Sequence, residues 1–141
     1  MNNDKRVFID TSAWIMLLNA DEKRHMEAAE AYNNIRTSER YTSNLVIGET
    51  YTWLRMRVGY SKAIEFLQAV NTMYSEKMLV IVWSDCDIEN RAGDYLRKFS
   101  DQDLSFTDAV SFVIMINHEI KAAFTFDKHF TVAGFLPINP L

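Results

Sequence analysis

Short apolar runs alternate with longer amphipathic segments along the chain. The apolar runs predict strands at residues 6–10, 40–43, 78–83, 122–126 and 136–139. The third run, MLVIVW, is apolar throughout, which is typical of a strand covered on both faces. Strands that alternate with helical segments predict an α/β fold, with a parallel sheet between two layers of helices.

The segments between these runs carry apolar residues at helical spacing. Helices are predicted within residues 21–36, 43–58, 61–75, 85–99 and 105–118, and another directly follows the first strand. In the 21–36 segment, Met26, Ala29 and Tyr32 recur on one face opposite charged residues. Thr11 or Ser12 could cap the helix after the first strand, because a hydroxyl accepts from the free N–H groups of a first turn.

Composition adds limits to this fold. The 141 residues, 48% of them hydrophobic, suit one domain that spans residues 1–141. The net charge of −4 argues against a strongly basic nucleic-acid binder. The single cysteine, Cys86, excludes an internal disulfide, and the polar start MNNDKR does not resemble a signal peptide. These features lead us to expect a cytoplasmic protein.

Four acidic residues interrupt the apolar segments. Asp10 follows VFI and Asp127 follows AFTF, so each comes at the end of a predicted strand. Glu49 interrupts the helical segment NLVIGETYTWL, and Asp108 lies in the first turn of the apolar helix TDAVSFVIM. Ligands of parallel sheets bind beyond the carboxyl ends of the strands, so these acids are candidates for one site.

Carboxylates among apolar neighbours point to a bound cation. Desolvating such a group is costly unless it is paired or coordinates a metal. A divalent cation would offset the repulsion among the four acids, and hard oxygen ligands favour Mg²⁺ or Mn²⁺ over zinc. A metal held in this way can polarise a phosphoryl oxygen and activate water, which predicts phosphodiester hydrolysis.

Four stretches of the chain, VFIDTSAWI, NLVIGETYTWL, LSFTDAVSFVIM and AAFTFDKHFTVAGF, together resemble PIN-domain ribonucleases, especially the VapC-like toxins of toxin–antitoxin pairs. The resemblance extends from Val7 to Phe135, with all four acids in the expected order. It implies a three-layer α/β/α sandwich and a magnesium-dependent endoribonuclease, with Asp10 and Asp108 as the main metal ligands. Glu49 and Asp127 would complete the acidic pocket as further catalytic residues.

The same resemblance implies supporting groups and partners. The hydroxyls of Thr11, Ser12 and Thr107 would lie close to the acids. VapC-like proteins are usually homodimers, and a cognate antitoxin blocks the acidic pocket, often with an arginine or lysine. Other family members act in RNA processing and quality control, so a housekeeping nuclease is an alternative to a toxin.

Basic residues near the acids are candidates for RNA contacts. Arg55 and Arg57 follow Glu49, Lys128 follows Asp127, and Lys98 is a more distant candidate. Cations at the rim of an acidic site would hold the phosphate backbone of the RNA.

Each acid also has an alternative interpretation. Asp10 and Asp108 suit helix starts, where a carboxylate is favoured by the free N–H groups and the helix dipole. Asp127 could open the turn at DKHF, and Glu49 could pair with a nearby arginine or lie on a solvated face. Asp103 is a candidate peripheral member of the site.

The three histidines show no ligand spacing and are expected at the surface or at helix ends; they are His25, His118 and His129.

Three other classes of protein compete with the nuclease. A haloacid-dehalogenase-type phosphatase needs a second Asp two residues after the first, where this chain has Ser12. A receiver domain needs an acidic pair after the first strand, but Asp10 is followed by Thr11. A nuclease-like domain that only binds a partner is disfavoured by the presence of all four acids.

Overall fold

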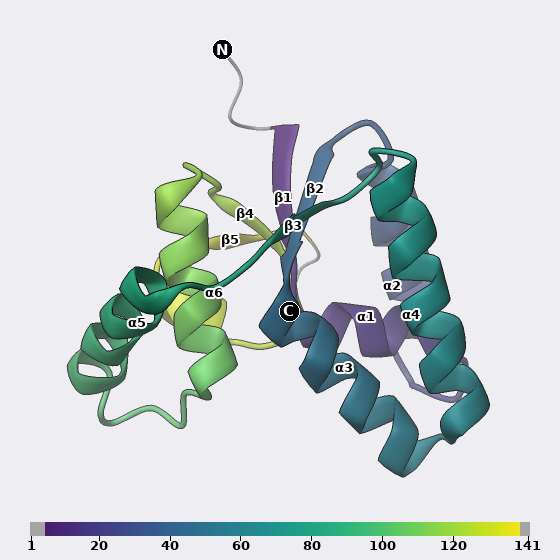
Figure 1. Ribbon diagram of the computed structural model, residues 1–141, viewed down its shortest axis with the longest axis horizontal. Coiled ribbons are helices and arrows are strands. Elements are labelled where there is room, and N and C mark those ends of the chain that lie inside the picture. The colour runs from purple at the N-terminus through teal and green to yellow at the C-terminus, as the bar shows by residue number, and fades with distance from the viewer. Residues whose placement is uncertain (1–4, 139–141) are drawn as a thin grey trace.

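A parallel sheet of five strands lies at the centre of the molecule, with helices on both of its faces (Figure 1). The computed structural model describes residues 5–138. The strands are β1 (Arg6–Ile9), β2 (Glu39–Ser43), β3 (Val80–Val82), β4 (Ala122–Phe124) and β5 (Leu136–Pro137). Their order across the sheet is β3-β2-β1-β4-β5, and each neighbouring pair is parallel. The predicted α/β sandwich is therefore confirmed.

The helices form two layers around this sheet. They are α1 (Thr11–Leu18), α2 (His25–Asn34), α3 (Asn44–Arg57), α4 (Tyr60–Ser75), α5 (Cys86–Lys98), α6 (Phe106–Asn117) and the short α7 (His129–Val132). Figure 1 shows α1 to α4 on one side of the sheet and α5 and α6 on the other. Every residue from Asp108 to Met115 in α6 is buried, as its apolar sequence predicts.

The helix predicted over residues 21–36 is shorter than expected and presents a different face. It begins only at His25, and Met26 has 81% of its surface exposed. The buried positions are Ala28 and Ala31, whose small side chains belong to the core. The prediction that Met26 and Ala29 form the buried face is therefore wrong, because α2 packs through its small residues.

The run at residues 78–83 is an edge strand and is not covered on both faces. Its ordered strand is only Val80–Val82, which pairs with β2 alone within the described sheet. Val80 is 41% exposed and Trp83 67% exposed, so the apolar sequence overstates its burial. The last predicted strand is confirmed at Leu136–Pro137, whereas Asn139 lies outside the described residues.

None of the helices within residues 5–138 is long and apolar enough to cross a membrane.

The strand order places a topological switch point between β1 and β4. The chain passes from β1 to β2 and β3 on one side of the sheet, and later adds β4 and β5 on the other side of β1. Ile9 pairs with Phe124, and the Asp10 N–H donates to the Phe124 carbonyl at 3.1 Å. The residues that follow β1 and β4 are thus adjacent at the carboxyl edge, where open α/β sheets bind ligands.

Candidate active site

The four acids predicted from the sequence converge on one cavity at this edge, which we call the acid cavity. Its volume is about 310 Å³. The residues that line it are Asp10, Thr11, Ser12, Ile15, Glu49, Asp103, Ser105, Asp108, Asp127 and His129. The carboxylates come from the end of β1, from α3, from the first turn of α6 and from the loop after β4. Four distant segments of the chain therefore present negative charge to the same space.

Asp10 is buried and held by hydroxyl groups. Its side chain accepts hydrogen bonds at Oδ2 from Ser12 Oγ at 2.9 Å and from Thr125 Oγ1 at 3.0 Å. Burial raises the pKa of Asp10 to about 6, although these hydroxyl donors oppose the rise. The expected capping of α1 by Thr11 or Ser12 is wrong, because Asp10 occupies the N-cap position and makes no side-chain cap. Its carboxylate is thereby left to face the cavity.

Thr125 is a site residue that the sequence interpretation missed. Its Oγ1 also accepts the Asp127 N–H at 2.9 Å, while Ser12 Oγ accepts the Phe126 N–H at 2.8 Å. The two hydroxyls therefore tie the loop after β4 to Asp10. A polar residue within an otherwise apolar predicted strand was the available signal, and β4 ends at Phe124, just before it.

Asp108 is the third residue of α6, where it forms a capping box with the N-cap residue Ser105, and it also lines the acid cavity. Ser105 Oγ accepts the Asp108 N–H at 3.0 Å, and Asp108 Oδ2 accepts the Ser105 N–H at 3.4 Å, which forms a capping box. Burial raises the pKa of Asp108 to about 8, and the negative charges of Asp10 and Asp127 add to the rise. The capping and site interpretations of this residue are thus compatible.

Glu49 and Asp127 are more open to solvent than the other two acids. Glu49 is exposed, and the Asp127 side chain is 28% exposed. The expectation of apolar surroundings therefore holds for Asp10 and Asp108 only. Within residues 5–138, Glu49 forms no ion pair with either nearby arginine. Asp103, the predicted peripheral member, is exposed at the cavity rim.

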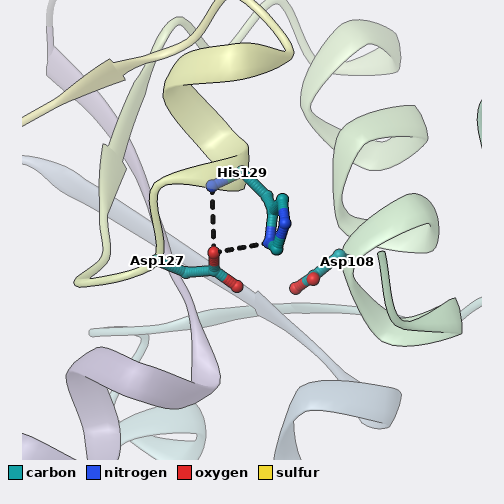
Figure 2. Close-up of side chains that lie close together, drawn as sticks. All are labelled: Asp108, Asp127 and His129. Atoms are coloured by element: carbon teal, nitrogen blue, oxygen red, sulfur yellow. Dashed lines mark hydrogen bonds and ion pairs between the residues drawn. The ribbon is translucent and has the colours of Figure 1, made fainter. Parts of the chain in front are cut away.

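His129 is a second residue that the sequence interpretation missed. It begins α7, so the expectation that it lies at a helix end is confirmed, but only 14% of its side chain is exposed and it lines the acid cavity. Its Nδ1 lies 2.8 Å from Asp127 Oδ1, which also accepts the His129 backbone N–H at 2.9 Å (Figure 2). Asp108, Asp127 and His129 each offer one possible ligand atom, and these three atoms all lie within 4.8 Å of one another. A histidine two residues after an acid was the available signal.

A larger groove, which we call the α3 groove, adjoins the acid cavity and shares Glu49 with it. Its volume is about 590 Å³. The residues that line it are Asn44, Leu45, Gly48, Glu49, Thr52, Trp53, Met56, Arg57 and Thr107. Thr107, predicted close to the acids, lines this groove and not the acid cavity, because it precedes the inward-facing Asp108 on α6. The groove gives the acid cavity an open, largely apolar extension along α3.

The basic residues proposed for RNA contacts differ in position. Arg57 lines the α3 groove, with its guanidinium 5.4 Å from the centre of the Trp53 ring. Arg55 lies over the Tyr60 ring at 5.6 Å and borders neither the groove nor the acid cavity. Lys128 is exposed between Asp127 and His129, and Lys98 is exposed on α5. Of these four residues, only Arg57 lines the groove that shares Glu49 with the acid cavity, and Lys128 directly follows Asp127 in the chain.

The donor set of the acid cavity fits a hard divalent cation. Five carboxylates line it, those of the four predicted acids and of Asp103, and the raised pKa values of Asp10 and Asp108 show how costly their charges are without a counter-charge. Thr11 Oγ1 is buried and has no hydrogen-bond partner among residues 5–138. Oxygen-rich sites of this kind suit Mg²⁺ or Mn²⁺.

The fold and the site define a class of protein. The PIN domain family matches residues 7–136 of the chain, and the chain belongs to this family. The prediction of a PIN-domain nuclease that resembles VapC toxins is therefore confirmed. The chain is 33% identical over 134 residues to the 23S rRNA-specific endonuclease VapC20 of Mycobacterium tuberculosis, in strains CDC 1551 / Oshkosh and H37Rv. The match covers 95% of this chain and 98% of VapC20.

Solved structures agree with this assignment. The crystal structure of M. tuberculosis VapC20, described as a sarcin–ricin loop cleaving toxin, has a TM-score of 0.85 and covers 95% of this chain and 99% of its own. FitAB bound to an IR36 DNA fragment has a TM-score of 0.69 at 13% identity, covering 93% and 92% of the two chains. FitAcB from Neisseria gonorrhoeae has a TM-score of 0.61 at 12% identity, covering 95% and 97%. The last two similarities concern the fold alone.

Proposed function

We propose that this chain is a divalent-metal-dependent endoribonuclease and the toxin of a toxin–antitoxin pair. The observation that carries the proposal is the convergence of Asp10, Glu49, Asp108 and Asp127 on one cavity at the switch point of the sheet. Two of these carboxylates, Asp10 and Asp108, are buried, and burial disfavours their charged forms. A site of this kind gains most when a cation binds.

The four acids divide into two roles in this proposal. Asp10 and Asp108 hold Mg²⁺ or Mn²⁺, and Ser12 and Thr125 fix the orientation of the Asp10 carboxylate. A metal held by these residues would supply Lewis-acid polarisation of a phosphoryl oxygen and a lowered pKa for a water. Glu49 and Asp127, which are more exposed, orient that water or complete the metal site.

The α3 groove is the proposed path of the RNA strand. It adjoins the acid cavity at Glu49, which lines both, and Arg57 lines the groove. Arg57 and Lys128 would hold phosphates on either side of the acids, with Arg55 as a peripheral contact. This arrangement separates the cations that bind RNA from the acids that bind metal, so the net charge of −4 does not oppose RNA binding.

The relative also suggests a substrate and partners. VapC20 is described as 23S rRNA-specific and as cleaving the sarcin–ricin loop, and we extend ribosomal RNA to this chain as the first substrate to test. A cognate antitoxin would inhibit the enzyme by placing an arginine or lysine in the acid cavity. A homodimer is also expected for a VapC-like protein, which would act in the cytoplasm, where ribosomes are found.

Cleavage of ribosomal RNA tests the proposal directly. Purified protein is incubated with intact ribosomes and with total RNA, in Mg²⁺, in Mn²⁺ and in excess EDTA, and cleavage sites are mapped by primer extension. Asp10→Asn and Asp108→Asn are each expected to reduce cleavage more than about a hundredfold, since even outer-shell changes at metal sites cost 10–100-fold. Glu65→Gln, an exposed acid on α4, serves as the matched control and should leave cleavage unchanged. Cleavage that survives both aspartate substitutions, or that persists in EDTA, would contradict the proposal.

A further inference from the structure

His129 is the one side chain with a nitrogen donor in the lining of the acid cavity, as far as residues 5–138 are concerned. We propose that a ring nitrogen of His129 binds the metal together with Asp108 and Asp127. The resulting mixed donor set makes the site prefer Mn²⁺ to Mg²⁺. The inference rests on the proposed function for the role of the metal, and it adds a ligand that is not one of the four acids.

The separations of the three side chains suit a shared cation. Their ligand atoms all lie within 4.8 Å of one another, and His129 Nδ1 is 2.8 Å from Asp127 Oδ1. Neighbouring ligands of an octahedral cation with bonds of about 2.1 Å lie about 3 Å apart. Figure 2 shows the imidazole ring and the two carboxylates gathered around one space. The donors therefore need little movement to bind one ion.

The His129 ring is held in place without a satisfactory partner for Nδ1. Its backbone N–H donates to Asp127 Oδ1 at 2.9 Å, which fixes the start of α7. Nδ1 itself is buried, and within the described chain no acceptor lies in a suitable direction for a hydrogen bond, despite the short contact with Asp127. Thr11 Oγ1, 7% exposed, is a second unpartnered buried atom in the lining of the same cavity. Two buried polar atoms without a hydrogen bond, beside clustered carboxylates, are surroundings in which a cation can bind.

A nitrogen ligand changes which metal the site selects. Mg²⁺ prefers oxygen ligands and keeps much of its water, whereas imidazole is a better ligand for transition metals. Four acids alone would not discriminate strongly between Mg²⁺ and Mn²⁺. His129 would therefore supply the discrimination between Mn²⁺ and Mg²⁺. Asp127 Oδ1 contacts both the backbone N–H and Nδ1 of His129, and these contacts hold the ring in position.

Pulsed electron paramagnetic resonance of bound Mn²⁺ tests this ligand without relying on activity. The chain has three histidines, so a variant with His25→Asn and His118→Asn retains His129 alone. We expect the wild-type protein and this double variant to show the ¹⁴N coupling of a directly bound imidazole. Labelling the double variant with ¹⁵N-histidine should convert that coupling to the ¹⁵N pattern. Absence of imidazole coupling, or coupling that does not respond to the label, would overturn the proposal.

Binding measurements add a second readout. Calorimetry should show that His129→Asn weakens Mn²⁺ binding about tenfold or more and Mg²⁺ binding less. The preference of the site for Mn²⁺ over Mg²⁺ should therefore become smaller. Circular dichroism without metal checks that the variant folds. If His129→Asn binds Mn²⁺ as tightly as the wild-type protein does, the histidine is only a partner of Asp127 and the proposal is contradicted. If imidazole coupling is present but no RNA is cleaved, the proposed function fails and the metal ligand stands; if RNA is cleaved but no coupling is seen, only the ligand fails.

Discussion

The two buried carboxylates of the acid cavity have different surroundings. Asp10, on the side of β1 and β4, is 2% exposed and accepts two hydroxyl hydrogen bonds, and its pKa rises only to about 6. Asp108, on α6, is 7% exposed and accepts a backbone N–H at 3.4 Å, and its pKa rises to about 8. The more buried group thus ionises more easily. The difference between the two pKa values therefore comes from the hydrogen bonds that each carboxylate accepts and from the neighbouring charges, more than from the extent of burial.

This contrast suggests that the Asp10 carboxylate is the one held in a fixed orientation within the acid cavity. Ser12 and Thr125 hold Asp10 as an oriented anion, whereas Asp108 needs a counter-charge from outside the protein. A bound cation would lower the pKa of both groups, and of Asp108 by the larger amount. The three predictions that follow test the two sides of the cavity and then the groove beside it.

The largest expected effect is on stability and concerns Asp108. A group whose pKa rises from 3.8 to about 8 on folding takes up a proton in the folded state. Its contribution to the free energy of unfolding is therefore full at low pH and is lost as pH rises through about 8. In EDTA, urea unfolding should show stability falling between about pH 5 and 8, and Asp108→Asn should remove a few kcal/mol of that fall.

Asp10→Asn is the comparison variant for this measurement. It should remove a smaller part of the fall, confined to lower pH, because the Asp10 pKa rises only to about 6. Mn²⁺ should reverse the trend in the wild-type protein, with its largest stabilisation near pH 8, where the carboxylates are ionised. Equal pH slopes in wild-type protein and in Asp108→Asn would refute the account.

A smaller effect is expected for Thr125→Val, which removes the hydroxyl between Asp10 and Asp127. Asp10 loses a donor and the Asp127 N–H loses its acceptor. We expect cleavage to fall about tenfold or more, and the free energy of unfolding to fall by about 1–3 kcal/mol. Thr50→Val is a matched control, because Thr50 is fully buried but its hydroxyl has no hydrogen-bond partner within residues 5–138. Equal loss of cleavage in both variants would show that Thr125 does not act through Asp10.

The smallest effect is expected in the α3 groove. Arg57→Glu should raise the RNA concentration needed for half-maximal cleavage several-fold, with a smaller change in turnover, because a phosphate contact contributes to binding. The effect should shrink as salt is increased. Arg36→Glu, an exposed arginine that lines neither the groove nor the acid cavity, is the control. Unchanged cleavage in Arg57→Glu would remove Arg57 from the proposed RNA path.

The sequence predicted the parallel sheet and the convergence of the four acids, because both depend on local signals. An apolar run that ends in Asp10 or leads to Asp127 is visible in the sequence alone. Parallel strands bring such ends to one edge whatever the details of packing. The order of the strands then places Asp10 beside the loop that carries Asp127.

The burial of individual side chains could not be predicted from the sequence, because it depends on which neighbouring element covers each of them. Met26 has the hydrophobicity of a core residue, yet α2 packs through Ala28 and Ala31. The run around Val80 has the composition of a central strand, but it lies at the sheet edge. The sequence signals of His129 and Thr125, a histidine two residues after an acid and a polar residue at the end of an apolar run, are common in proteins, and these residues join the site because β4 pairs with β1.

The pairing of β1 with β4 also determines when the site can form. Asp10 and Thr125, joined by a hydrogen bond, lie 115 positions apart in the chain. During synthesis Asp10 can acquire this partner only after almost the whole polypeptide has been made, and closing so large a loop then carries an entropic cost. A nascent chain that ends before β4 therefore has three of the four acids but lacks the strand that joins Asp10 to the loop of Asp127, so the complete acid cavity can form only near the end of synthesis.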